Sequence, residues 1–379
     1  MPNTKRHILI MSSWFPTRID PYAGNFVERF AHLLSDTYEV TVLHTMGDKN
    51  CSSIEVDDQQ VENLRIIRIY HRIASNRFIH WWLQRKALRK GLLMLDHIDL
   101  IFAHVFLPRA MQFARVQRYF HVPLIVMEHG SYYRKKLRKN FLSLHQQVIK
   151  RGSRHTSEIV AVSNVLRSDM KPLFPTTKIQ VIPNFVDEQI FTLRDTNPVE
   201  RKKFIHISTL DKNTKNPVFL FDGFLNAYLE SGKTISLTVV SDQNTDEWER
   251  WAKINSCSDA ITFTGPCEWD EVSQLLKEHD ALILTSEYET FSIVIAEAWL
   301  TGTPVISTAV GIAANMTEAL GIQIEQNNIS DLKRAILSMV SGNVQYDKEF
   351  LRTFGMQFSK ESVKNQLIEL FNKHFIIYE

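Results

Sequence analysis

Residues 285–311 decide the fold, and they read TSEYETFSIVIAEAWLTGTPVISTAVG. An apolar run at 281–284 precedes this stretch, and a second run at 304–306 lies near its end. The residues from about Phe291 to Leu300 predict a helix between two strands. A strand, a turn and a helix start in this order indicate an α/β unit. At the turn such a unit exposes free backbone N–H groups and the positive end of the helix dipole.

Two glutamates in this stretch, Glu289 and Glu297, stand eight positions apart. Side chains on a helix lean toward its N-terminus, so Glu297 can reach the pocket that Glu289 enters from the turn. A phosphate-bearing ligand with several hydroxyls suits such a pocket, because amides bind phosphate and carboxylates accept from hydroxyls. Two solvated surface glutamates are the alternative. The apolar neighbours of Glu297 favour a functional role, since a buried glutamate without a partner is costly.

The same stretch resembles the donor-binding signature of the retaining glycosyltransferases of family 4. Ser292 replaces the usual glycine of that signature, and Ile312 replaces a second glycine. The resemblance implies that Glu289 binds a sugar hydroxyl and Glu297 the ribose, while the amides of Phe291, Ser292 and Ile293 bind the phosphates. The matching segments are Glu289-Thr290-Phe291-Ser292, Glu297-Ala298, Gly302-Thr303-Pro304-Val305 and Gly311.

Short apolar runs alternate with helical patterns along the whole chain, which predicts βαβ units and parallel sheets. The length of 379 residues calls for two domains. The resemblance implies the GT-B architecture: two Rossmann-like, doubly wound parallel-sheet α/β domains that face each other across a cleft. We expect an acceptor-side domain at 1–195 with a C-terminal helix at about 360–379, and a nucleotide-sugar domain at 196–359. The predicted strands are 7–11, 39–43, 64–69, 100–103, 124–127, 159–162, 179–182, 204–207, 235–240, 261–264, 281–284, 305–307 and 322–324.

The first half carries weaker signals for a site. Gly24 follows the first strand, where the family has a glycine-rich loop near the donor diphosphate. An ordinary turn before a helix is the alternative. His129 and Gly130 follow a strand, so the resemblance places His129 against the donor sugar as a catalytic residue, with Gly130 allowing close backbone approach. His104 also ends a strand, and acceptor contact and plain packing both stay open for it.

The run after residue 207 departs from the family. Lys215 matches a lysine that binds the diphosphate in the family, but Thr209 stands where an arginine is expected. The loss removes one bidentate charge contact. Three explanations stay open: Lys212 compensates, the hydroxyls of Ser208 and Thr209 bind phosphate, or the donor binds more weakly.

Composition fits a globular protein without secretion or membrane-spanning signals, with 44% hydrophobic and 23% charged residues. The three cysteines lack metal spacing, and a reducing cytoplasm is the expected location. The net charge of +2 hides an asymmetry: residues 1–195 hold 28 Lys and Arg against 17 Asp and Glu, or +11, which leaves −9 for the rest. With the aromatic and basic run at 77–90 and a second basic cluster at 134–139, this charge suggests an anionic membrane surface as a partner. RNA fits less well, because no RNA-binding motif accompanies the charge.

Taken together, the sequence is identified as a member of the retaining glycosyltransferases. We expect a UDP- or GDP-sugar donor and a glycan or lipid-linked acceptor, in bacterial surface polysaccharide or glycoconjugate synthesis. No cofactor and no metal are expected, because the sequence has no Asp-x-Asp motif, no His-x-x-x-His motif and no paired cysteines. Two other functions stay open. One is a sugar-nucleotide epimerase of the same fold, and the other is a catalytically silent subunit that binds sugar nucleotides.

Overall fold

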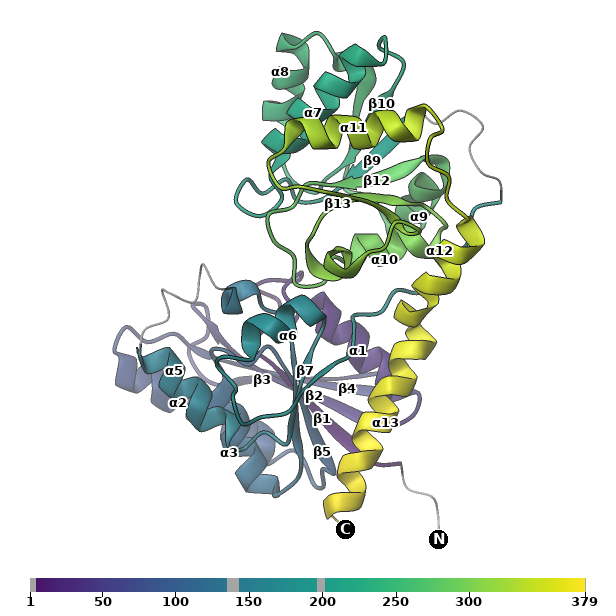
Figure 1. The fold of residues 1–379 in the computed structure, drawn as a ribbon. Helices are drawn as coiled ribbons and strands as arrows, with labels where there is room; N and C mark the ends of the chain where they lie inside the picture. The colour runs from purple at the N-terminus through teal and green to yellow at the C-terminus, as the bar shows by residue number, and fades with distance from the viewer. Residues whose placement is uncertain (1–4, 135–142, 196–201, 379) are drawn as a thin grey trace. The chain divides into compact units, whose positions relative to one another are not determined.

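The computed structural model describes residues 5–134, 143–195 and 202–378 (Figure 1). The chain divides into two compact units. The first comprises Met1–Val162, Leu166–Ile182 and Lys364–Glu379, and the second comprises Ser163–Val165 and Pro183–Val363. Each unit contains one sheet, parallel except at one edge of the first, with helices packed on it, so the doubly wound α/β fold class expected from the sequence is confirmed.

The first unit is built on a sheet in the order β3-β4-β2-β1-β5-β6-β7-β8. All neighbouring strands are parallel except β3 and β4, which form an antiparallel pair at the edge. The central strands are buried on both faces, as apolar parallel strands require. Their bounds are β1 (His7–Ser12), β2 (Glu39–Asp48), β3 (Glu55–Val61), β4 (Leu64–Arg72), β5 (Leu100–His104), β6 (Leu124–Glu128), β7 (Glu158–Ala161) and β8 (Ile179–Val181).

Helices cover both faces of this sheet (Figure 1). Helix α1 starts directly after Gly24, whose φ of 71° places it in the left-handed region. Helix α13 begins at the end of the second unit and continues in the first. The helices of this part of the chain are α1 (Asn25–Ser35), α2 (Arg77–Leu92), α3 (Ala110–Phe120), η1 (Ser131–Tyr133), α5 (Ser143–Ser153), α6 (Asn164–Met170) and α13 (Lys360–Tyr378).

The second unit has a fully parallel sheet in the order β11-β10-β9-β12-β13-β14. Numbered within the unit this order is 3-2-1-4-5-6, the doubly wound arrangement whose direction reverses between β9 and β12. Its strands are β9 (Lys203–Ile207), β10 (Ser236–Val240), β11 (Ile261–Gly265), β12 (Ala281–Leu284), β13 (Val305–Thr308) and β14 (Gly321–Ile324). Its helices are α7 (Pro217–Glu230), α8 (Asp246–Ile254), η2 (Ser258–Ala260), α9 (Trp269–Glu278), α10 (Ile293–Leu300), η3 (Gly311–Asn315), α11 (Ile329–Val340), α12 (Lys348–Gly355) and η4 (Met356–Phe358).

The chain enters the second unit earlier than the expected boundary at residue 195, because residues 183–195 pack on that unit. Val186 forms a β-bridge with Ser359. The backbone N–H of Arg194 donates to the carbonyl of Thr301 at 3.1 Å, and its guanidinium donates to the carbonyl of Leu276. Residues 196–201, which follow the expected boundary, lie outside the described residues.

Every run predicted as a strand is one in the structure, within two residues at each end except for longer C-terminal ends of β2 and β4. Strand β3 is the one described strand that the sequence did not predict. Its sequence EVDDQQV is polar and mostly exposed, since an edge strand needs no apolar face. The hydrogen bonds to β4 hold it in place, and no side-chain pattern marks it.

Candidate functional site

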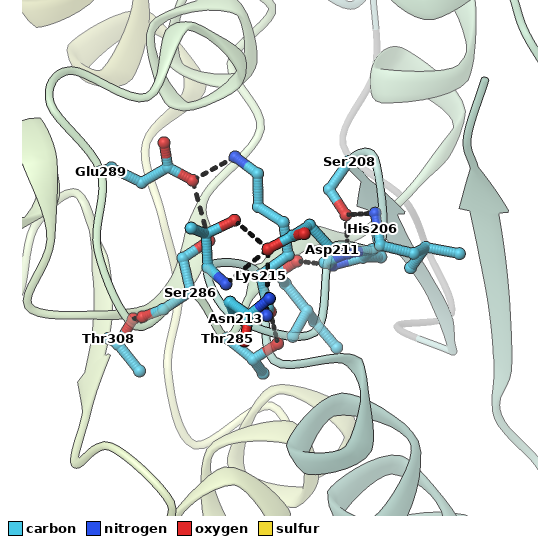
Figure 2. A network of polar contacts seen from close by, with 12 residues as sticks. His206, Ser208, Asp211, Asn213, Lys215, Thr285, Ser286, Glu289 and Thr308 are labelled. Carbon is cyan, nitrogen blue, oxygen red and sulfur yellow. Dashed lines mark hydrogen bonds and ion pairs between the residues drawn. The ribbon is translucent and has the colours of Figure 1, made fainter. Parts of the chain in front are cut away.

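In the second unit, two loops meet where the strand order reverses, at the carboxyl ends of β9 and β12. Lys215, before α7, reaches Glu289, before α10, with 2.5 Å between Lys215 Nζ and Glu289 Oε1 (Figure 2). The hydroxyl of Ser286 donates to the same carboxylate oxygen at 2.9 Å. Both charged side chains stay partly open to solvent, at 22% and 13% of their surface. The site therefore carries a cation and a carboxylate at the place where doubly wound sheets bind ligands.

Backbone contacts fix the two loops against each other. The backbone N–H of Glu287 donates to the carbonyl of Thr214 at 2.8 Å. The hydroxyl of Thr285 donates to the carbonyl of Lys215 at 3.1 Å (Figure 2). Within the first loop, Asp211 accepts from the N–H and the hydroxyl of Thr214. Lys215 therefore projects from a loop held at both ends, which lowers the entropy cost of presenting its charge.

A buried histidine holds the start of the same loop. His206 lies 2.8 Å from the carbonyl of Ile283 through Nδ1 and 2.7 Å from the hydroxyl of Ser208 through Nε2 (Figure 2). Burial, with a smaller contribution from the charge of Lys215, lowers the pKa of His206 to about 4, although the hydrogen bond to Ile283 opposes the shift. The ring is therefore neutral at pH 7, and its Nδ1–H donates to the carbonyl. Ser208 donates its hydroxyl to Nε2 and accepts from the N–H of Leu210.

These contacts bear on the three explanations for the arginine that Thr209 replaces. The hydroxyl of Ser208 is already used within the loop. Lys212 points to α8, where its Nζ lies 2.6 Å from a carboxylate oxygen of Glu247 and 5.7 Å from the ring centre of Trp248. Thr209 is exposed. Lys215 is thus the lysine of this loop that faces Glu289.

The start of α10 differs from the expected helix by two residues. The helix begins at Ile293 because Ser292 has φ 73° and ψ 79°, in the left-handed region. This conformation explains why the family pattern has glycine there. The hydroxyl of Ser292 is buried without a hydrogen-bond partner among the described residues, and it caps no N–H of the helix. The ring of Phe291 is buried against Phe358, so the backbone of Phe291 is the part of that residue left to meet a ligand.

Gly311 and Glu297 complete this region. A Cβ on Gly311 would lie 2.3 Å from the carbonyl oxygen of Phe291, and the N–H of Ile312 donates to that oxygen at 2.9 Å. Only glycine allows this close approach. Glu297 lies in the second turn of α10, four residues after Ile293, and it is buried among apolar neighbours. One helix thus carries Glu297 and the N-terminus that follows Ser292.

In the first unit, two histidines pair at the carboxyl ends of β5 and β6. His104 Nδ1 lies 3.1 Å from His129 Nε2, and the rings stack with their centres 5.3 Å apart. His104 is fully buried, and burial together with the neighbouring His129 lowers its pKa well below the usual value. Phe26 and Phe30 pack against the pair, with the ring of Phe26 4.3 Å from that of His129. His104 therefore positions the ring of His129.

Glu128 is the residue of this region that the sequence reasoning did not assign to the site. It is fully buried, and its carboxylate accepts five hydrogen bonds. Burial raises the pKa of Glu128, and the donated hydrogen bonds oppose that rise. A charged residue that closes an apolar strand before His-Gly and two tyrosines was the available signal. The five donors are the N–H groups of Phe106, His129 and Gly130 and the hydroxyls of Tyr132 and Tyr133.

Gly24 and Gly130, the two candidate glycines of the first unit, have separate structural roles. A Cβ on Gly24 would lie 2.5 Å from the carbonyl oxygen of Trp14. The helix that follows Gly24 brings Phe26 onto His129. Gly130 faces the ring of Tyr132, 2.2 Å from where its Cβ would lie. The structure therefore brings Gly24, His104, His129 and Gly130 to one edge of the first sheet.

Two protein-family descriptions match the chain. "Glycosyltransferase Family 4" matches residues 23–190, and "Glycosyl transferases group 1" matches residues 201–341. Among relatives, the N-acetyl-alpha-D-glucosaminyl L-malate synthase of Bacillus anthracis is 29% identical over 173 residues, which is 43% of this chain and 44% of that protein. An uncharacterized glycosyltransferase of Methanocaldococcus jannaschii is 21% identical over 93% of this chain and 95% of its own length.

Solved structures share the fold over nearly the whole chain. Sucrose-phosphate synthase from Thermosynechococcus elongatus superposes with a TM-score of 0.74 at 16% identity, covering 98% of this chain and 100% of that one. Anabaena HepE, solved in complex with UDP and glucose, has a TM-score of 0.70 at 15% identity, covering 97% of this chain and 100% of that one.

Proposed function

The chain belongs to glycosyltransferase family 4, the group 1 glycosyltransferases, and on that premise we propose that it moves a sugar from a nucleotide donor with retention of anomeric configuration. The observation that carries the proposal is the contact between Lys215 and Glu289 at the point where the strand order of the second sheet reverses. An ammonium group there binds a diphosphate, and a carboxylate there accepts from sugar hydroxyls.

Each residue of the second unit then has a role. Lys215 neutralises the diphosphate as the bond from the sugar to the phosphate breaks, together with the amides at the start of α10. Glu289 holds a hydroxyl of the transferred sugar, and Glu297 holds the ribose hydroxyls. When the diphosphate enters, it competes with Glu289 for the ammonium group of Lys215, so the ion pair seen here keeps the lysine in place for the donor.

His129 is the residue of the first unit proposed to face the donor sugar as it gains positive charge. Its Nε2 is directed at His104, so Nδ1 is the atom proposed to act. In this front-face reaction the departing phosphate oxygen takes the proton of the acceptor hydroxyl, and the new glycosidic bond forms on the face that the phosphate leaves. Such a reaction needs no separate protein base.

The substrates proposed are a UDP- or GDP-sugar and a glycan or lipid-linked acceptor. UDP is the first choice of nucleotide, because Anabaena HepE was solved with UDP and glucose on the same fold. We propose a cytoplasmic enzyme of surface polysaccharide or glycoconjugate synthesis. Among the described residues, no helix is long and apolar enough to cross a membrane.

Donor cleavage is proposed to proceed without a bound cation. Within residues 5–134, 143–195 and 202–378, His, Cys, Asp and Glu side chains form no group of three or more that could hold a metal ion. Lys215 and the α10 amides take the place of the cation at the diphosphate. We expect turnover to persist in excess EDTA. Complete loss that Mg²⁺ or Mn²⁺ restores would contradict this.

A donor panel tests the function. Thermal unfolding with UDP-, GDP- and ADP-sugars should raise the melting temperature for one nucleotide class, because only the folded protein binds the donor. Radiolabelled donor with candidate acceptors should then give a glycosylated product. Conversion of the donor sugar without any acceptor would support the epimerase instead. Tight nucleotide binding without turnover on any acceptor would support the silent subunit.

A further inference from the structure

Helix α2 divides into a packed half and an exposed half. In the C-terminal half, Gly91 packs against Leu43 and Ile69 so closely that a Cβ would lie 2.5 Å from a methyl group of Leu43. The N-terminal half, residues 77–86, has no buried residue. The side chain of Asn76 accepts from the first N–H groups of the helix and fixes its start. The exposed half is therefore a defined helix that the core of the unit does not need.

Large apolar side chains cover this exposed half. Phe78 is 84% exposed, Trp81 51% and Trp82 54%. Ile79 and, past the end of the helix, Leu93 are exposed as well. Single exposed apolar residues are ordinary, but a contiguous group of this size marks a surface that binds a partner.

Lysine and arginine side chains accompany these apolar residues, and no ion pair neutralises their charge within the described part of the chain. From Arg72 to Leu95 the sequence has six Lys and Arg and no Asp or Glu. None of the six forms a salt bridge with a described residue. On α3, burial and the charges of Arg85 and Arg118 lower the pKa of Arg115. The six residues are Arg72, Arg77, Arg85, Lys86, Arg89 and Lys90.

Two hollows flank α2, and both combine apolar walls with cations. One, of about 790 Å³, is lined by Ile79, Trp82 and Leu93 together with Arg72 and Lys90. The second, of about 550 Å³, is lined by Trp82, Leu92 and Tyr119 with Arg85 and Arg115. Neither hollow has an acidic residue in its lining. Arg85 and Lys86 also lie over the rings of Trp81 and Trp82, at 4.4 and 5.2 Å from the ring centres.

We propose that this α2 surface docks on an anionic membrane. The aromatic rings would enter the interface, and the cations lining the two hollows would bind lipid headgroup phosphates. Lipid is favoured over RNA because no RNA-binding motif accompanies these basic residues. A second copy of the chain would bring the same cations against each other. The purpose of this docking, the delivery of a lipid-linked acceptor, rests on the proposed function. Vesicle binding itself is measurable without turnover.

The second basic cluster suggested by the sequence adds nothing to this argument. Only Arg134 of that cluster is described, and Lys135, Lys136, Arg138 and Lys139 lie outside the described residues.

Co-sedimentation with vesicles tests the proposal on the full chain. Vesicles of phosphatidylcholine alone are compared with an equimolar mixture of phosphatidylcholine and phosphatidylglycerol, at low and high salt. Lys86→Gln with Lys90→Gln should weaken binding to the anionic vesicles about thirtyfold, from about 1 kcal/mol per cation. The matched control replaces Lys233 and Lys253, two exposed lysines of the second unit, by glutamine and should leave binding unchanged.

A second variant tests the apolar contribution. Trp82→Ala should lower anionic vesicle binding about tenfold, from the apolar area withdrawn from the interface. Trp269→Ala in the second unit, where the side chain is also exposed, is the control. Equal binding to neutral and anionic vesicles, binding to neither, or binding to RNA or to itself through α2 in place of vesicles would overturn the proposal. If the α2 variants lose vesicle binding but keep full turnover on a short soluble acceptor, the docking proposal is supported. If they lose turnover but keep vesicle binding, the result bears only on the proposed function.

Discussion

The two sheet edges that carry the candidate residues handle charge in opposite ways. In the second unit, Lys215 and Glu289 form a partly exposed ion pair on loops joined by hydrogen bonds to the backbone. In the first unit, His104 and His129 form a buried pair, and the neighbouring carboxylate of Glu128 accepts five hydrogen bonds. Charged side chains at the edge of the second sheet are therefore accessible to solvent, whereas at the edge of the first sheet the buried carboxylate of Glu128 holds the neighbouring loops together.

Glu128→Gln replaces the buried carboxylate at the edge of the first sheet and should have the largest effect on stability. An amide cannot accept from all five donors, and its NH₂ group would face some of them. The free energy of unfolding should fall by about 3 kcal/mol, as expected for a buried charged hydrogen-bond centre. Urea unfolding measures this. Tyr133→Phe, which removes one donor, should cost only about 1 kcal/mol. An unchanged urea midpoint for Glu128→Gln would contradict the assigned role.

Glu289→Gln replaces the carboxylate at the edge of the second sheet and should lower turnover. It removes charge and acceptor capacity but little volume, so kcat should fall about a hundredfold while the urea midpoint shifts little. Glu297→Gln should instead mainly weaken nucleotide binding, since its proposed partner is the ribose. Steady-state kinetics with calorimetric nucleotide titrations separate the two. Full activity in both variants would show that the site lies elsewhere.

Ser292→Gly, at the edge of the second sheet, should have a smaller effect, and that effect is on stability. Glycine relieves the left-handed strain and removes the buried hydroxyl without a described partner, so stability should rise by about 1 kcal/mol. Ser292→Ala keeps the strain and loses only the hydroxyl, so it should fall between the two in urea unfolding. If Ser292→Gly is the less stable protein, the hydroxyl has a stabilising partner.

The sequence predicted the strands well because parallel strands buried on both faces are continuous apolar runs, such as Leu124–Glu128 before its last residue. It did not predict β3, whose pairing depends on the neighbouring strand. It indicated Lys215 only through the family resemblance, and it did not show that Lys215 meets Glu289, since residues 74 positions apart meet only through the order of strands in the sheet.

Other features of the site could not be read from the sequence for a different reason. Two lysines three positions apart in one loop look alike in sequence, and only the fold shows that Lys212 contacts Glu247 on α8 while Lys215 contacts Glu289 before α10. The left-handed φ of Ser292 was hidden because serine gives no sign of backbone conformation. The role of Glu128 needed the folded loops that bring its donors together.

The central claim is that the second unit binds a nucleoside diphosphate through Lys215, and paired lysine variants test it most directly. Calorimetric titration of UDP and GDP into the unmodified chain, Lys215→Met and Lys212→Met compares two lysines three positions apart in one loop. The nucleotide that binds should lose about a hundredfold in affinity with Lys215→Met, as expected for a lost charged contact to phosphate, and stay unchanged with Lys212→Met. Equal affinity for Lys215→Met and the unmodified chain, or a larger loss for Lys212→Met, would contradict it.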